Sequence, residues 1–322
     1  MKHEDRPQYQ AHGAEVDFRP DLNGPLPPLA RWQGHPILPS ILTRPHMARK
    51  NSMPTTPSFA NRMDADVRQA RLLETVFQED SFSRKVRRRG WVRTWLEAHD
   101  YPTAQIQAGP FPLQELSQKL GGLDAGVIKP VQATNAWGVT PFRRTGPFSF
   151  RTLFDGEEVR MTSLLEALHA PMQRYMFPNT WQIEELLVSP DGPDTVPDDF
   201  KFYAFRGTVA LILQIRRGRD GARYNFRDAD WQPVFTGKYA DKTDADLTAP
   251  HDPEALLGLA KSISAALPVP FCRIDLYESH RGPVVGELTP EPGGYNLFDE
   301  STDIYLGTFH EWASAELTVS AS

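Results

Sequence analysis

A long β-hairpin is the feature of this sequence that most constrains its fold. Apolar and aromatic residues dominate two runs, residues 200–205 and 208–215, and only Arg206 and Gly207 separate them. Two residues that include a glycine, placed between two strand-like runs, are typical of a tight turn joining antiparallel strands. The chain must therefore contain an antiparallel sheet in its second half.

The first strand of this hairpin has two chemically different faces. Side chains alternate between the faces of a sheet, so Asp199, Lys201 and Tyr203 lie on one side. The residues between them are Phe200, Phe202 and Ala204, and they form the opposite, apolar side. We expect the apolar side to face a core. Lys201 on the other side could reach the terminal phosphate of a nucleotide, although a lysine on an edge strand would look the same.

Other patterns alternate between strands and helices along the chain. We expect strands at residues 125–130, 181–188, 272–277 and 284–288, and a hairpin formed by 148–154 and 158–161 around Asp155-Gly156. We expect helices at 64–77, 90–99, 163–175 and 253–266. This arrangement predicts an α+β fold with mostly antiparallel strands in the second half.

Bulk properties exclude several classes of protein. The formal net charge of −6 argues against a dedicated nucleic-acid binder, because binding phosphates requires a surplus of lysine and arginine. Cys272 is the single cysteine, so no intramolecular disulfide can form. The first residues do not resemble a secretory signal, and no apolar stretch is long enough for a membrane span. We expect a cytoplasmic protein whose proline-rich residues 1–65 form an irregular arm.

Two carboxylates at the ends of neighbouring strands indicate a metal site. Asp275 and Glu287 lie on strands that would pair, so both could face one cleft and share Mg²⁺, which prefers hard oxygen ligands. Arg273 is two residues before Asp275 and therefore faces the same side, where it could bind a substrate carboxylate. The alternative is an ordinary ion pair between Arg273 and Asp275 beside a solvated Glu287.

Lys129 and the pair Glu184 and Glu185 are weaker signals. Lys129 ends a strand and precedes a loop containing Gly138, where a lysine can neutralise nucleotide phosphates. Glu184 and Glu185 lie within a strand that could hold adenine through its backbone. Taken alone, each of these signals favours a structural role over a functional one.

In this order the segments resemble the ATP-grasp superfamily, and more narrowly the TupA-like ATP-grasp proteins linked to envelope-polymer biosynthesis. The matching segments are Val127-Ile-Lys-Pro130, Ile183-Glu-Glu-Leu-Leu187, Asp198-Asp-Phe-Lys-Phe-Tyr-Ala-Phe-Arg-Gly207, Arg273-Ile-Asp-Leu-Tyr277, Gly286-Glu-Leu-Thr289 and Leu306-Gly307. They cover residues 66–310. The resemblance implies an ATP-grasp fold, in which a nucleotide lies between two α+β subdomains under a mobile lid.

The resemblance also implies roles for individual residues. Lys129 would contact nucleotide phosphates. Adenine would be held by residues 184–187, which include Glu184, Glu185 and Leu187. Lys201 would reach the terminal phosphate, with Asp199 beside it in the nucleotide site. Asp275 and Glu287 would bind Mg²⁺, and Arg273 would lie beside the reacting carboxyl group. Many ATP-grasp ligases have asparagine where this chain has Thr289, and the upstream phosphate-binding residue could be Lys85 or Arg89.

The resemblance divides the chain into four parts and suggests its activity. After the arm come an N-terminal subdomain at 66–125, a lid at 126–188 and a C-terminal subdomain with the metal site at 189–322. The implied reaction is ligation of a small-molecule carboxylate to an amine through an acyl phosphate, with ATP and Mg²⁺. A kinase or a catalytically silent nucleotide-binding scaffold would use the same groups. The sequence does not identify the substrates or the oligomeric state.

Overall fold

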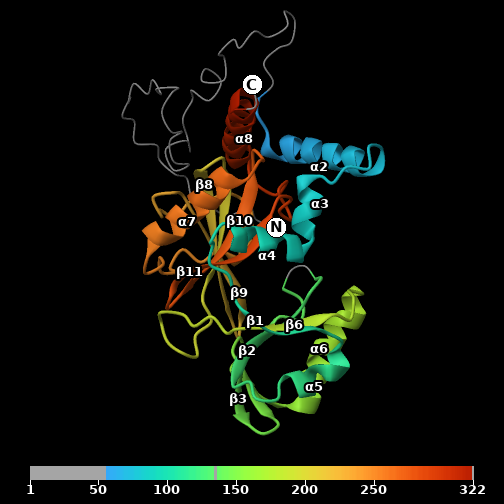
Figure 1. The fold of residues 1–322 in the computed structure, drawn as a ribbon. Helices are drawn as coiled ribbons and strands as arrows, with labels where there is room; N and C mark the ends of the chain where they lie inside the picture. The colour runs from blue at the N-terminus through green and yellow to red at the C-terminus, as the bar shows by residue number, and fades with distance from the viewer. Residues whose placement is uncertain (1–55, 134–135, 321–322) are drawn as a thin grey trace, which may run out of the picture.

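Two antiparallel sheets, each covered by helices, make up the part of the molecule shown in colour in Figure 1. The structure is a computed structural model that describes residues 56–133 and 136–320. A five-stranded sheet and its helices form the upper part in Figure 1, and a six-stranded sheet with α5 and α6 forms the lower part. The predicted α+β class with antiparallel strands is confirmed.

The five-stranded sheet has the order β11-β10-β7-β8-β9, and every neighbouring pair is antiparallel. Its strands are β7 (Asp199–Phe205), β8 (Thr208–Gly218), β9 (Gly221–Arg227), β10 (Cys272–Ser279) and β11 (Gly282–Thr289). The predicted hairpin is β7 and β8, and Arg206 and Gly207 both take the positive φ angles that such a tight turn requires. Strand β9, which we did not predict, extends the sheet beyond β8.

Each face of this sheet buries its own core. One core combines Tyr203 and Phe205 of β7 with Phe59 of α2 (Phe59–Thr75) and Phe309 of α8 (Glu300–Ser320). The opposite core combines Phe200, Phe202 and Ala204 with α7 (Pro253–Ala266), α3 (Phe82–Arg87) and α4 (Arg89–Ala98). The predicted alternation along β7 is therefore confirmed.

The six-stranded sheet has the order β1-β6-β2-β3-β4-β5. Its strands are β1 (Ile106–Phe111), β2 (Ala125–Pro130), β3 (Thr140–Gly146), β4 (Ser149–Thr152), β5 (Glu158–Arg160) and β6 (Trp181–Glu184). Its buried residues pack against α5 (Leu116–Lys119), α6 (Met161–Tyr175) and the 3₁₀ helix η2 (Leu113–Glu115). Strand β1 comes from residues that we assigned to the N-terminal subdomain, yet it pairs with β6 in this sheet.

Helix α8 is the largest element that the sequence patterns did not reveal. It runs for 21 residues and packs against α2, so the first and last described helices are in contact, and Figure 1 shows α2 running crosswise to α8. Helix α2 begins at Phe59, earlier than expected, with Ser58 as its N-cap. The boundary drawn between residues 65 and 66 therefore falls inside α2. Most of the expected arm, residues 1–55, lies outside the described residues.

One expected strand is shorter than predicted. Strand β6 ends at Glu184, and residues 185–188 leave the sheet toward β7. Its partner β1 pairs with β6 only between Ile106 and Phe111, and past that point Glu185 hydrogen-bonds to Gln105 while His280 donates to Val188. A second 3₁₀ helix, η3 (Ala240–Lys242), follows β9. Among the described helices, none has the length and apolar character needed to cross a membrane.

Candidate functional site

A cluster of buried charges surrounds Lys201 on β7. The Lys201 ammonium donates to Asp275 on β10 at 2.5 Å and to Asp199 at 2.9–3.0 Å. Both aspartate side chains are only 3% exposed, and the Lys201 side chain is 13% exposed. Lys201 thus bridges two carboxylates that are almost entirely removed from water.

Two arginines complete this cluster. Arg273 grips Asp275 in a fork, with Nε 2.7 Å from Oδ1 and Nη2 2.8 Å from Oδ2, and Nη2 also donates to Thr289 at 3.1 Å. Arg217 on β8 donates to the Oδ2 atom of Asp199 at 3.1 Å. Paired N–H groups on one carboxylate fix its orientation as well as its charge.

Strand register explains why residues far apart in sequence meet here. Lys201 lies opposite Asp275 in the β7–β10 pair, and Asp275 lies opposite Glu287 in the β10–β11 pair. Residues that face each other across antiparallel strands share a face of the sheet, so the predicted placement of Asp275 beside Glu287 is what the register gives. The cluster lies where β7 begins, next to the connection from the six-stranded sheet.

The two carboxylates are suitable ligands for Mg²⁺, but two side chains do not fill its coordination shell. Asp275 and Glu287 offer hard oxygen ligands, and Glu287 is exposed at the surface of the sheet. No group of three or more metal-ligating side chains occurs in residues 56–133 and 136–320. Mg²⁺ is often bound by one or two carboxylates, with water and substrate phosphates as its other ligands, and this pair fits that arrangement.

The charges of the cluster determine its protonation. Burial alone would raise the pKa of Asp199, but Lys201 and Arg217 outweigh it and hold the pKa below its ordinary value of 3.8. Burial opposes the charge of Arg273, yet Asp275 raises the pKa of this guanidinium. Asp199 and Arg273 are therefore both charged at neutral pH.

Lys129 and Glu184 form a separate pair in the six-stranded sheet. The Lys129 ammonium lies 2.6 Å from Glu184 Oε2, and both side chains are largely buried. The strand register places Lys129 opposite Gln182, whose amide donates to the other oxygen of Glu184 at 2.6 Å. The structure thus brings these two predicted nucleotide-site residues into direct contact.

Glu185 and Leu187 lie on the connection between the two sheets. Glu185 accepts hydrogen bonds from the backbone amide of Gln105, at 2.9 Å, and from Arg281 in the β10–β11 turn. Its side chain thereby links the six-stranded sheet to the five-stranded one. Leu187 is half-buried two residues further along. The roles predicted for both residues in holding adenine stay predictions.

Lys238 is a charged residue near this site that the sequence patterns did not single out. It is 3% exposed, donates to the Gly293 carbonyl at 2.8 Å and lies over the rings of Phe298 and Tyr239. Burial, with a further contribution from Arg273, lowers its pKa to about 8. Lys238 lies in a loop without strand or helix periodicity. It contacts the Pro/Gly loop that begins at residue 290 in space, through the Gly293 carbonyl, and not in sequence.

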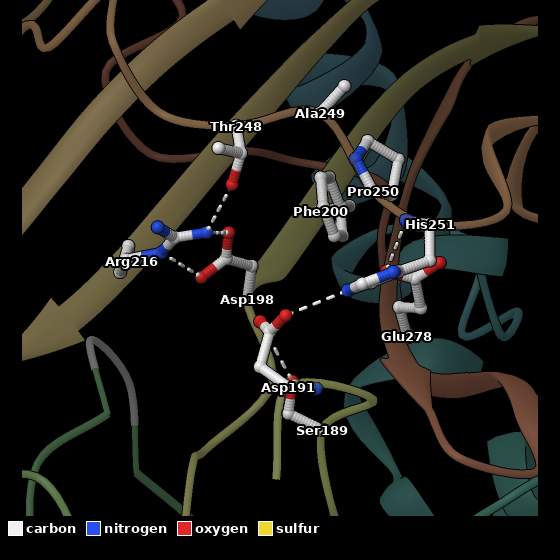
Figure 2. A pocket seen from close by; sticks show the side chains of 10 residues that line it. All are labelled: Ser189, Asp191, Asp198, Phe200, Arg216, Thr248, Ala249, Pro250, His251 and Glu278. Carbon is white, nitrogen blue, oxygen red and sulfur yellow. Dashed lines mark hydrogen bonds and ion pairs between the residues drawn. The ribbon is translucent and has the colours of Figure 1, made fainter.

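A polar pocket lies on the opposite face of the five-stranded sheet (Figure 2). Phe200, Arg216 and Glu278 come from β7, β8 and β10 of the sheet, while Asp198 directly precedes β7 and His251 precedes α7. His251 Nε2 lies 2.7 Å from Asp191, and Glu278 accepts hydrogen bonds from the backbone amides of His251 and Asp252. The hydrogen bond with Asp191 raises the pKa of His251.

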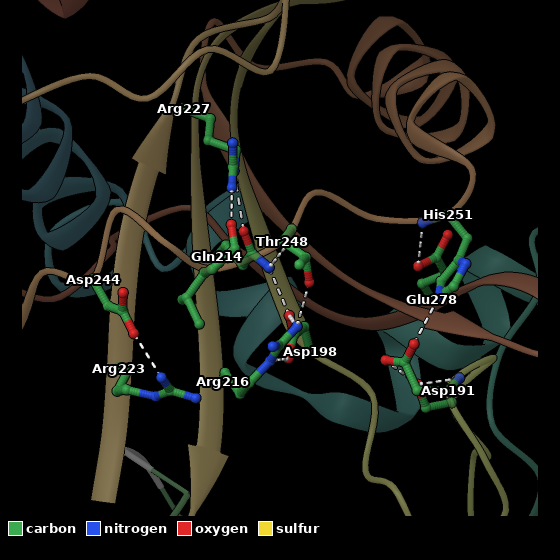
Figure 3. A network of polar contacts seen from close by, with 12 residues as sticks. Asp191, Asp198, Gln214, Arg216, Arg223, Arg227, Asp244, Thr248, His251 and Glu278 are labelled. Atoms are coloured by element: carbon green, nitrogen blue, oxygen red, sulfur yellow. Dashed lines mark hydrogen bonds and ion pairs between the residues drawn. The ribbon is translucent and has the colours of Figure 1, made fainter.

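The acidic groups of this pocket already have protein partners. Arg216 donates to both oxygens of Asp198 at 2.8 Å, and Gln214 joins Asp198 to Arg227 in the same network (Figure 3). Asp191 belongs to the connection between the sheets, so its contact with His251 ties that connection to the start of α7. The network holds segments together, and we assign it no ligand.

Comparison with known proteins identifies one family. Residues 151–310 match the TupA-like ATP-grasp family. No curated protein sequence matches the chain. This segment contains Lys201, Arg273, Asp275 and Glu287, whereas Lys129 lies before it.

Several solved ligase structures are similar in fold at low sequence identity. D-alanine–D-alanine ligase from Bacillus anthracis complexed with ATP is 13% identical, with 79% of this chain and 76% of that chain covered and a TM-score of 0.42. D-cycloserine synthetase DcsG is 14% identical, with 79% and 81% covered and a TM-score of 0.41. ATP-grasp ligase PsnB, complexed with a precursor variant, Mg and ADP, is 12% identical, with 79% and 70% covered and a TM-score of 0.38.

Proposed function

Since the chain belongs to the TupA-like ATP-grasp family, we propose that it is an ATP- and Mg²⁺-dependent ligase that joins a carboxylate to an amine. The observation that carries this proposal is the buried cluster of Lys201, Asp275 and Arg273 inside the matched segment. Buried charges that converge from separate strands are common at functional sites. The polar face of β7 and β10 supplies such a site.

The residues of the cluster divide the proposed reaction between them. A substrate carboxylate attacks the γ-phosphorus of ATP, ADP leaves, and an acyl phosphate forms. The amine then attacks the acyl carbon, phosphate leaves, and an amide results. Lys201 neutralises the transferred phosphoryl group, and Arg273 orients the carboxylate and stabilises charge on its oxygens. Asp275 and Glu287 would hold Mg²⁺, which neutralises the nucleotide phosphates when bound.

The nucleotide would be held between the two sheets. Lys129 would contact its phosphates from the six-stranded sheet, and Asp199 would lie beside Lys201 in the nucleotide site. Glu184, Glu185 and Leu187 would contact adenine where the chain passes from one sheet to the other. We further propose that the segment at 126–188 moves as a lid and that its closure excludes water, which protects an acyl phosphate from hydrolysis.

Trapping the acyl phosphate tests this proposal. The protein is incubated with ATP, Mg²⁺, hydroxylamine and a panel of amino acids and sugar acids, and hydroxamate and ADP are measured together. We expect equal amounts of both with the correct carboxylate. A phosphorylated product without hydroxamate would indicate a kinase, and tight ATP binding without turnover would indicate a silent nucleotide-binding protein.

A matched pair of variants shows whether the cluster is the site of this chemistry. Asp275→Asn removes the charge of a proposed metal ligand, and we expect it to lower ADP formation by about a hundredfold or more. Asp220→Asn makes the same chemical change at an exposed position in the β8–β9 turn and should leave the rate unchanged. Equal rates for the two variants would contradict the assignment.

A further inference from the structure

The Lys201 ammonium is paired with the Asp275 carboxylate, which is a proposed metal ligand. Asp275 Oδ2 accepts from Lys201 Nζ at 2.5 Å and from Arg273 Nη2 at 2.8 Å, while Oδ1 accepts from Arg273 Nε at 2.7 Å. Both oxygens of this side chain are therefore held by cationic N–H groups.

We propose that Lys201 blocks Asp275 from binding a metal ion and leaves it for a nucleotide phosphate when Mg²⁺ binds. This proposal rests on the proposed function, because it takes Asp275 as a metal ligand and Lys201 as a phosphate ligand. The proposal adds that Asp275 cannot bind a metal ion while Lys201 is paired with it. Lys201 pairs with Asp275 when no nucleotide is bound, and with a nucleotide phosphate when one is bound.

Contact distances require this exchange. Mg²⁺ binds carboxylate oxygens at about 2.0–2.1 Å and demands a nearly regular shell of oxygen ligands. An ammonium 2.5 Å from Asp275 Oδ2 lies where that shell would be, and it carries the same sign of charge as the metal. Lys201 must therefore move away from Asp275 before this oxygen can bind a metal.

The charge balance explains why the nucleotide has to take part. The buried part of the cluster contains two carboxylates, Asp199 and Asp275, and three cations, Lys201, Arg217 and Arg273, while Glu287 adds a third carboxylate at its exposed edge. A divalent cation added to this buried part, which carries a net positive charge, would be repelled strongly, because the repulsion between like charges is poorly screened there. Nucleotide phosphates bring the negative charge that reverses the balance, and they also give the Lys201 ammonium a new partner.

Arg217 makes the departure of Lys201 tolerable. A buried carboxylate that loses its partner is strongly destabilised. Asp199 accepts from Arg217 at 3.1 Å as well as from Lys201, and Asp275 keeps its fork with Arg273. Each carboxylate thus retains one guanidinium after Lys201 has moved.

Metal binding without nucleotide tests the proposal. Mn²⁺ is used as the probe, and its binding is followed by the electron paramagnetic resonance signal of the free ion. We expect the wild-type protein to bind Mn²⁺ weakly alone and at least about tenfold more tightly with ADP. Lys201→Met should bind Mn²⁺ at least about tenfold more tightly than the wild type when no nucleotide is present.

Three further variants identify the cause of any change. Lys201→Arg keeps the positive charge and should bind Mn²⁺ as weakly as the wild type. The double variant Lys201→Met/Asp275→Asn should lose the gained affinity if the metal binds at Asp275. Lys261→Met removes an exposed lysine of α7 and should change nothing. Thermal unfolding of each variant confirms that it is folded.

Two outcomes separate this proposal from the proposed function. Equal Mn²⁺ affinities of the wild type and Lys201→Met in the absence of nucleotide would overturn the blocking role of Lys201. Failure of the wild type to bind ADP or ATP in calorimetry would instead contradict the proposed function. The comparison without nucleotide does not depend on that second result.

Discussion

At the scale of single residues, Lys238 links burial to the pH dependence of stability. Its ammonium is held among aromatic rings and a backbone carbonyl, and the pKa falls from its ordinary value of 10.5 to about 8. In the unfolded chain the same group has water around it and keeps its ordinary pKa. Folding therefore favours the neutral form of Lys238.

The sign of the effect on stability follows from proton binding. Below pH 8 both states carry the proton, and between pH 8 and 10.5 the unfolded state binds more protons than the folded state. The free energy of unfolding therefore gains a contribution from Lys238 that rises through this window, to at most about 3 kcal/mol. Lys238→Met should lack this rise.

Urea denaturation between pH 7.5 and 10.5 measures this contribution of Lys238 to the free energy of unfolding. The difference in unfolding free energy between the wild type and Lys238→Met should shift in favour of the wild type as the pH increases. Lys261→Met serves as the control, because an exposed lysine keeps its ordinary surroundings in both states and should give a curve parallel to the wild type. A parallel curve for Lys238→Met would show that its pKa is not lowered by burial.

At the scale of elements, the crossing of α2 and α8 depends on one glycine. A Cβ atom on Gly307 would lie 2.7 Å from the backbone nitrogen of Ser58 and 2.8 Å from that of Phe59. The backbone at the start of α2 therefore rests directly on α8, and Ala60 donates to Asp303 one turn away at 2.8 Å. Backbone atoms fixed by a helix cannot move aside as a flexible side chain can.

Two glycine-to-alanine variants separate sterics from helix propensity. Alanine in a helix is favoured over glycine by about 0.5–1 kcal/mol, so Gly258→Ala, which meets nothing within 4 Å in α7, should stabilise the protein. Gly307→Ala should instead destabilise it by about 1–3 kcal/mol because the added methyl group overlaps α2. Chemical denaturation measures both, and stabilisation by both variants would show that α2 does not contact α8 so closely.

At the scale of the whole molecule, a few side chains link the two sheets. Arg219 in the β8–β9 turn donates through Nε and Nη2 to the Asp155 carbonyl in the β4–β5 turn, at 3.1 and 3.0 Å. Arg143 on β3 contacts Asp194, on the connection between the sheets, at 2.7 Å. These contacts are few and partly exposed, so we expect the six-stranded sheet to move relative to the five-stranded one.

Removing one of these links should be visible in hydrogen exchange. Arg219→Ala deletes both hydrogen bonds to Asp155, worth about 1 kcal/mol in total, and should speed amide exchange in residues 149–160 about fivefold. Arg223→Ala deletes an exposed ion pair with Asp244 that lies within the five-stranded part. Exchange in the same residues should not change in this control, and equal exchange in both variants would contradict the link.

Local patterns allowed many of the elements and the site strands to be predicted. Strand β2 and helix α7 have the predicted bounds, and the hairpin of β7 and β8 turns at the predicted residues. These elements carry a clear period or turn signal that depends only on neighbouring residues. Strand β9 and helix α8 were missed. Gly307 interrupts the apolar pattern of α8, and its helical state depends on packing against α2.

The sequence alone determined the α+β class and the hairpin, because alternation and turn chemistry act over a few residues. It also led us to propose Lys201, Arg273, Asp275 and Glu287 as site residues. Tertiary structure decided which of these charges touch. The register of β7 against β10 places Lys201 between two aspartates, and burial makes that contact strong. It also placed Lys238 where Arg273 helps to lower its pKa, and it attached β1 to the second sheet. Such contacts join residues distant along the chain, and no local pattern encodes them.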